Sequence, residues 1–197
     1  ILMFIKLKFD TKTLDSKIME NKIEDATQVL EYMSHTIDDF RGFFSPKKEK
    51  ERFYLHELIE NILLISSNMF KNNNIEIVCD IDKNIVLNSY LNEFQQVILN
   101  ILKNAKDALV ENNIKSPYIK IEAKVDEKNI YLSITDNAGG IKTEPINKIF
   151  EAYFTTKPQS QGTGIGLYMS KMILEKSMKG KLFVENLENG ARITLKL

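Results

Sequence analysis

The sequence predicts an α+β chain in which a partial helical hairpin, residues 1–48, precedes a two-layer α/β sandwich, residues 49–197. Two observations support this division. A long heptad pattern of apolar residues occupies the first part, and segments of helical and strand periodicity alternate in the second. Pro46 and the charged run that follows it to Arg52 interrupt the heptads. Because proline disfavours helix in the residue before it, we expect the domain boundary there.

The first part is expected to contain the end of one helix and the whole of another. Residues 1–9 are apolar except for Lys6 and Lys8, and Asp15 or Ser16 could cap the helix that follows the polar residues 10–13. A lone helix cannot bury the apolar seam of this second helix, so the pattern favours a symmetric bundle with a second copy of the chain. Packing on its own domain is the alternative. The seam residues are Ile23, Ala26, Leu30, Met33, Ile37, Phe40 and Phe44.

The second part reads as a mixed sheet covered by helices on one side. Alternating apolar residues predict two hairpins, 118–125 with 130–135 and 181–185 with 192–197. The other elements are predicted as a strand at 53–55, a helix at 57–71, strands at 75–81 and 85–87, and helices at 91–110 and from Gly166 to about 178.

Composition restricts the compartment and the partners. Lys plus Arg and Asp plus Glu both number 27, so the overall charge does not favour nucleic acid or an acidic membrane as a partner. The only cysteine, Cys79, cannot form an internal disulfide, which suits a reducing, cytoplasmic setting, and it is expected to be a small apolar residue of its strand. No apolar run approaches the ~20 residues of a membrane span. No signal peptide is visible, and without an initial Met the chain reads as a fragment.

Two asparagines mark the helix at 91–110. Asn100 and Asn104 lie four residues apart, so their amides share one polar face of a helix whose other face is apolar. Asparagine disfavours helix because its side chain competes for backbone groups, which indicates a task other than folding. A solvated asparagine stripe is the alternative interpretation.

Three further blocks follow in order. Asp136–Gly140 ends a predicted strand, and Gly162–Leu167 opens a predicted helix. Together with residues 100–108, these blocks resemble the N, G1 and G2 boxes of the ATP-binding domain shared by sensor histidine kinases, DNA gyrase, MutL and heat-shock chaperone ATPases. Residues 150–157 resemble the F box of histidine kinases in particular. The resemblance implies a sandwich of the histidine kinase/gyrase/MutL type.

The resemblance also implies a site for ATP and Mg²⁺. Asn104 would bind the metal and Asn100 the phosphate and metal shell, Asp136 would accept the adenine amino group, and Lys157 would contact phosphate. Ile141 and Leu167 would be apolar walls, and the glycines would let backbone amides and a helix N-terminus approach the nucleotide. The predicted nucleotide-binding residues are Asn100, Asn104, Asp107, Asp136, Gly140, Ile141, Lys157, Gly162, Thr163, Gly164, Gly166 and Leu167.

Asn100 bears on the reaction class. Hydrolytic members of this superfamily carry a glutamate at that position as the base for water, and an amide cannot take a proton. We therefore expect a kinase that transfers the γ-phosphate to a histidine for relay to a response regulator receiver domain, acting as a homodimer through its helices. A hydrolysing ATPase and a non-catalytic nucleotide-binding adaptor are the alternatives.

His35 is not expected to be the phosphoacceptor. Residues 33–44 resemble the second bundle helix of sensor kinases whose acceptor precedes Trp-Arg-Gln-Pro-Leu, a motif that the chain lacks. Pro46 follows His35 by eleven positions. That is roughly three helical turns, too few for the remainder of a hairpin. The acceptor is expected upstream of Ile1, so the chain by itself is not expected to autophosphorylate.

Overall fold

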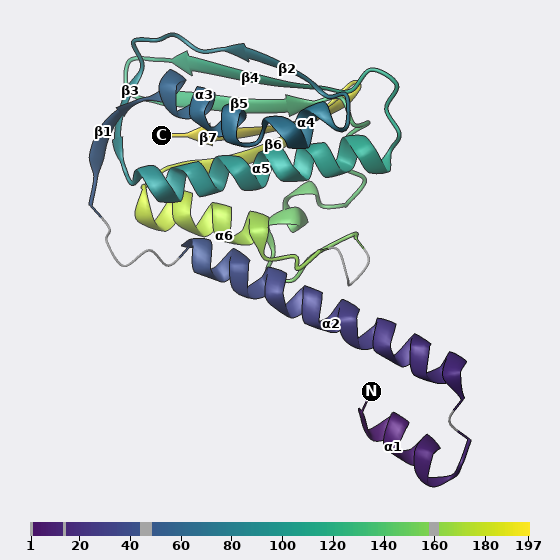
Figure 1. The fold of residues 1–197 in the computed structure, drawn as a ribbon. Helices are drawn as coiled ribbons and strands as arrows, with labels where there is room; N and C mark the ends of the chain where they lie inside the picture. Colours follow the sequence, from purple (N-terminus) through teal and green to yellow (C-terminus); the bar gives the residue numbers. More distant parts are fainter. Residues whose placement is uncertain (1, 14, 44–48, 158–161) are drawn as a thin grey trace.

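The structure, a computed structural model, describes residues 2–13, 15–43, 49–157 and 162–197. Two helices come first, α1 (Leu2–Asp10) and α2 (Ser16–Phe43), and they extend away from a compact α/β sandwich (Figure 1). The predicted cap is confirmed, because the backbone N–H of Ile18 donates to Asp15 Oδ1 at 2.7 Å at the start of α2. The partial helical hairpin is therefore present.

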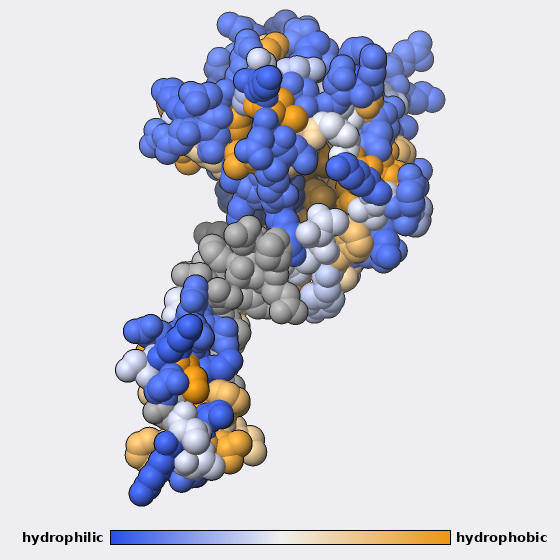
Figure 2. All heavy atoms as spheres, turned by 90° about the vertical axis from the view of Figure 1, so that its right-hand side faces the viewer, coloured by the Kyte–Doolittle hydropathy of each residue, from blue (hydrophilic) through white to orange (hydrophobic). Residues whose placement is uncertain are grey.

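Apolar side chains of the predicted seam lie at the surface of α2. Ile23, Leu30 and Met33 are 56%, 66% and 53% exposed. Figure 2 shows apolar residues on the surface of this helical part. The side chains of the other large seam residues, Ile37, Phe40 and Phe44, lie outside the described part of the structure, as do the His35 side chain and the boundary at Pro46.

A five-stranded mixed sheet forms one layer of the sandwich. Its strand order is β2-β4-β5-β7-β6, with β2 and β4 parallel and every other pair antiparallel. Both predicted hairpins are confirmed. The strands predicted at 53–55 and 85–87, which are β1 (Glu51–Tyr54) and β3 (Val86–Ser89), instead form a small antiparallel sheet of their own. The bounds of the five strands are β2 (Glu76–Asp80), β4 (Tyr118–Val125), β5 (Ile130–Asp136), β6 (Lys181–Leu187) and β7 (Gly190–Lys196).

Helices cover one face of this sheet (Figure 1). They are α3 (Leu55–Ile65), α4 (Ser67–Lys71), α5 (Leu91–Glu111) and α6 (Gly166–Met172), which a π-helical turn, Ile173–Ser177, continues. The apolar face of α5 supplies fully buried core residues, among them Phe94, Ile98 and Leu102, which pack in one cluster with Ile121 and Leu132 of the sheet. The core thereby fixes the rotation of α5, and with it the direction of its polar face.

One local prediction was wrong, and two local features were not predicted. The helix predicted at 57–71 is divided at Ser66, whose hydroxyl donates to the carbonyl of Ile62 at 2.6 Å and competes with the helical ladder. Cys79 lies in the predicted strand, β2, and its exposure, which was not anticipated, reflects the position of β2 at the edge of the sheet. A 3-10 helix at Ile146–Phe150 was not anticipated.

Within residues 2–13, 15–43, 49–157 and 162–197, the helices are all too short or too polar to cross a membrane.

Candidate functional site

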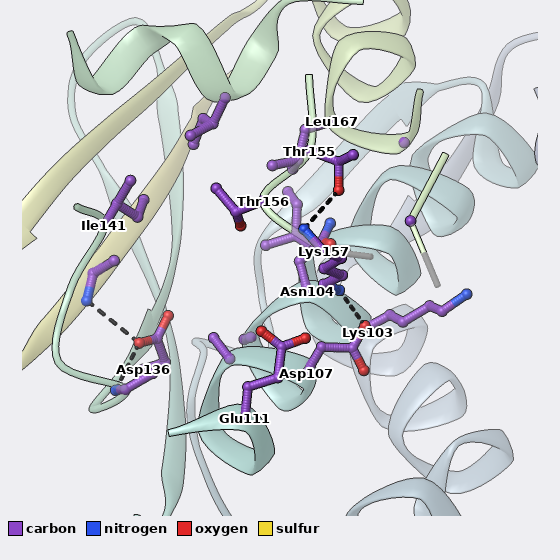
Figure 3. A pocket seen from close by; sticks show the side chains of 18 of the residues that line it. Lys103, Asn104, Asp107, Glu111, Asp136, Ile141, Thr155, Thr156, Lys157 and Leu167 are labelled. Carbon is purple, nitrogen blue, oxygen red and sulfur yellow. Dashed lines mark hydrogen bonds and ion pairs between the residues drawn. The ribbon is translucent and has the colours of Figure 1, made fainter. Parts of the chain in front are cut away.

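A cavity of about 740 Å³ opens between α5, the end of β5 with the loop after it, and the start of α6. All twelve residues predicted from the sequence line it. Figure 3 shows Asp136 and Ile141 on one side of this cavity and Asp107 and Lys157 on the other. We call these the Asp136 end and the Lys157 end. The structure thus brings the predicted residues together, whereas their roles as ligands stay a prediction.

The polar face of α5 forms the floor of the cavity. The Asn104 amide donates from Nδ2 to the backbone carbonyl of Asn100 at 2.9 Å. This bond orients the side chain and leaves its oxygen, Oδ1, as the atom available to a ligand. The Asn100 amide donates to Ser170 Oγ of α6 at 2.9 Å. Asn100 therefore joins the floor to α6 and Asn104 presents an oxygen.

The Asp136 end is built by backbone groups. Asp136 is the last residue of β5, and its Oδ1 accepts from the N–H of Ala138 at 2.9 Å and from the N–H of Ala191 at 3.4 Å. Burial raises the pKa of the Asp136 carboxyl, although both backbone donors act in the opposite direction. The second carboxylate oxygen, Oδ2, is the one that a donor on a bound ligand could reach.

The loop after Asp136 is fastened to β6 by one side chain. Asn186 accepts from the N–H of Ile141 at 2.7 Å and donates to the Ile141 carbonyl at 2.9 Å. This reciprocal pair imitates one rung of a β-ladder. It holds the apolar Ile141 side chain at the cavity wall.

The Lys157 end is held by charges. Lys157 Nζ lies 2.5 Å from Asp107 Oδ2, and Asp107 also forms an ion pair with its neighbour Lys106. Burial alone would raise the pKa of the Asp107 carboxyl, but hydrogen bonds and charges from the two lysines hold that pKa below its usual value. Asp107 is therefore ionised at neutral pH and paired twice.

Two glycines of the block Gly162–Leu167 lie where a side chain would clash with neighbouring atoms. A Cβ on Gly164, whose φ is +65°, would lie 2.5 Å from the backbone carbon of Tyr153. A Cβ on Gly166 would lie 2.4 Å from Asn100 Oδ1. Any larger residue would push the N-terminus of α6 away from the floor of the cavity.

Sequence reasoning missed several residues of the cavity. Helical spacing would have found two, because Lys103 precedes Asp107 by one turn and Glu111 follows it by one turn. No sequence signal identified the two hydrogen bonds between the Asn186 side chain and the Ile141 backbone, which depend on a hairpin far along the chain. The remaining polar lining residues that were missed are Asn112, Lys142, Thr143, Thr155 and Thr156.

Charge in the cavity is balanced. Its described lining contains the three cations Lys103, Lys142 and Lys157 and the three carboxylates of Asp107, Glu111 and Asp136. No group of three or more His, Cys, Asp or Glu side chains that could hold a metal occurs among the described residues. A divalent cation at Asn104 would thus need oxygens that a ligand supplies.

Comparison with known proteins gives a family model and relatives that agree with the family expected from the sequence. The family model for histidine kinase-, DNA gyrase B- and HSP90-like ATPases matches residues 90–197, more than half of the chain. The two-component sensor PprA of Pseudomonas aeruginosa is 29% identical over 206 residues, which cover 100% of this chain and 22% of PprA. Sporulation kinase B of Bacillus subtilis is 25% identical over 197 residues, covering 98% of this chain and 44% of that kinase. The chain thus spans less than half the length of either relative.

Solved structures that resemble this chain also come from histidine kinases. The nucleotide-free catalytic domain of the histidine kinase ThkA is 28% identical with a TM-score of 0.67, covering 76% of this chain and 95% of that domain. ThkA in complex with the response regulator protein TrrA shares the fold over 100% of this chain and 55% of that one, at 22% identity and a TM-score of 0.70. The fold predicted from the sequence is confirmed. The chain belongs to the histidine kinase-, DNA gyrase B- and HSP90-like ATPase family, in its branch of bacterial two-component sensor histidine kinases.

Proposed function

We propose that the chain is the kinase core of a two-component sensor, which binds Mg-ATP and transfers the γ-phosphate to a histidine imidazole for relay to a response regulator. One observation carries this proposal. The twelve residues predicted from four separate sequence blocks line one cavity of about 740 Å³, a volume within the range of about 300–1,000 Å³ that is usual for small-molecule sites. The acceptor is a histidine other than His35.

The residues of the cavity fit Mg-ATP. Asp136 at the buried end offers an acceptor for the adenine amino group, next to the apolar wall formed by Ile141. Asn104 Oδ1 offers a neutral oxygen of the kind that Mg²⁺ binds, with the phosphates supplying further oxygens. The bound cation would neutralise charge on the phosphates, which the balanced lining does not do by itself. Lys157 would supply a further positive charge there.

Calorimetric titration of ATP in the presence of Mg²⁺ and in the presence of EDTA tests this assignment. We expect Mg²⁺ to tighten ATP binding to the unaltered chain, and Asn104→Ala to abolish that difference while leaving the weaker binding in EDTA. Asn92→Ala, an exposed asparagine on the same helix, is the matched control. Equal ATP affinity with Mg²⁺ and with EDTA in the unaltered chain would contradict the metal site.

Transfer to a protein histidine is favoured over hydrolysis by Asn100. Its amide is engaged with Ser170 Oγ and has no proton-accepting nitrogen, so it does not activate water. Steady-state phosphate release from ATP should therefore stay at the level of a heat-denatured sample. Rapid turnover would establish a hydrolysing ATPase instead, and nucleotide binding with neither hydrolysis nor transfer to a histidine would leave the non-catalytic nucleotide-binding adaptor.

Assembly through the helical part is the remaining element of the proposal. Exposed apolar residues of α1 and α2, such as Phe9, Ile23 and Leu30, would be covered by a second copy. The complex of ThkA with TrrA supports a receiver domain as the partner. Light scattering should give the mass of a dimer for the unaltered chain and of a monomer for Leu30→Asp. A dimer of Leu30→Asp would exclude this seam as the interface.

A further inference from the structure

The ammonium group that would contact phosphate is already occupied. Lys157 Nζ donates to Asp107 Oδ2 at 2.5 Å, and each of the two side chains is only 18% exposed. In this largely covered ion pair the Asp107 carboxylate competes with any other anion for the same lysine. Phosphate that enters the cavity must therefore displace a carboxylate before it can use Lys157.

The backbone of Lys157 has contacts of its own that do not involve its ammonium group, so the exchange can take place by movement of the side chain. The N–H of Lys157 donates to Thr155 Oγ1 at 3.1 Å. Gly162 packs against the same segment, because a Cβ built there would lie 2.5 Å from Thr155 Oγ1 and 3.0 Å from Lys157 Cβ. The lysine stem has four rotatable bonds, which suffice to carry the ammonium between neighbouring anions.

The charges on both sides of the exchange remain compensated. When Lys157 leaves, Asp107 retains its ion pair with Lys106. Lys157 then pairs with phosphate, so neither state leaves a half-buried charge without a partner. While Asp107 stays in the cavity as a carboxylate, however, it also repels the phosphates directly, since both are anions on the same wall.

We propose that Asp107 is a positioning residue that competes with nucleotide phosphate for Lys157, and thereby lowers the affinity for ATP and ADP and speeds their release. This inference rests on the proposed nucleotide site. It assigns to Asp107 a role opposite to that of a ligand, because loss of its charge should strengthen binding. The effect should require phosphate, so adenosine, which has none, should bind as before.

Calorimetry with Mg-ATP, Mg-ADP and adenosine on Asp107→Asn tests the proposal. We expect binding of ATP and ADP to tighten about three- to tenfold, the scale of a partly covered ion pair, with adenosine unchanged. Stopped-flow release of a fluorescent ATP analogue should slow by a similar factor, since such changes act mainly on dissociation. Lys157→Gln should weaken ATP binding, and in that background Asp107→Asn should tighten ATP less than about twofold, because the competing lysine is gone.

Glu111→Gln is the matched control, since Glu111 lines the same cavity one helical turn beyond Asp107. It removes an equal charge without releasing Lys157, and it should tighten ATP less than Asp107→Asn does. Unchanged or weaker ATP binding by Asp107→Asn, with normal binding by the unaltered chain, would overturn the competition; weaker binding would make Asp107 a ligand of the cation. Absence of nucleotide binding by the unaltered chain would instead overturn the proposed function, and the competition with it.

Discussion

The two ends of the cavity hold a carboxylate by opposite means. At the Asp136 end the partners are backbone N–H groups of two separate segments, and burial raises the pKa of the carboxyl. At the Lys157 end the partners of Asp107 are side-chain ammonium groups, which lower its pKa against the effect of burial. Backbone donors cannot leave without unfolding, whereas lysines can change partners. In the proposed function the first end would therefore serve ligand recognition and the second the exchange of Lys157 between anions.

The sharpest way to break this comparison is to disturb the backbone behind Asp136. A Cβ on Gly190 would lie 1.8 Å from the Asp136 carbonyl oxygen. Gly190→Ala should therefore separate β7 from β5 and destabilise the fold by roughly 3 kcal/mol, the upper range for overpacking. Chemical denaturation measures this change. Asn189→Ala in the same turn is the control, because its recorded contact with Gly139 uses the backbone carbonyl. Equal stability of the two variants would contradict the assigned packing.

A smaller effect is expected from a substitution that removes the proposed acceptor for the adenine amino group and keeps the backbone hydrogen bonds. Asp136→Asn keeps an oxygen for the donors at Ala138 and Ala191 but loses the charge that would accept the adenine amino group. ATP affinity should fall by about 2 kcal/mol, the scale of a hydrogen bond to a charged group. Calorimetry with ATP and adenosine should give similar losses, because adenosine contains the same amino group. Unchanged affinity would remove Asp136 from the site.

The smallest expected effect is on the stability of the ligand-free chain, to which Asp136 and Asp107 should contribute with opposite signs at neutral pH. The folded-state pKa of Asp136 is raised, so stability falls as pH rises through the interval from the unfolded to the folded pKa, and Asp136→Asn should stabilise the chain at pH 7. The pKa of Asp107 is lowered, so its contribution is present above the unfolded pKa and is lost as pH falls through the folded one.

Asp107→Asn should accordingly destabilise the chain at pH 7. Thermal unfolding of both variants at pH 7 and pH 3 measures the two signs, and the differences should shrink at the lower pH. Shifts of the same sign at pH 7 would show that the two carboxylates are not held by opposite means.

Much of the fold was predictable because its signals are local. The apolar period of α5 fixes which face is buried, so the positions of Asn100 and Asn104 on the opposite face followed from spacing alone. Both hairpins were evident from alternation and turn residues. The exposure of Cys79 was not, since the period of a strand does not tell whether the strand lies at the edge of a sheet.

The site was predictable as a set of residues and not as a set of contacts. Four motif blocks named twelve lining residues, yet the ion pair of Asp107 with Lys157 joins residues 50 positions apart, and the two bonds of Asn186 to Ile141 span 45. Such pairs depend on tertiary packing that no short window of sequence contains. Lys103 and Glu111 could have been found, because they extend the spacing of residues already chosen on α5.

The two backbone hydrogen bonds to Asp136 Oδ1 also limit when this end of the cavity can form during synthesis of the chain. Its second donor, Ala191, lies 55 residues beyond Asp136, on a strand that leaves the ribosome after all the other strands of the sheet. The helices and the first hairpin can collapse earlier, because their contacts are closer in sequence. The Asp136 end is then completed last, when β6 and β7 dock against β5. Under the proposed function, a nascent chain that lacks this hairpin would have no complete place for the base, so nucleotide would bind only molecules whose sheet is complete.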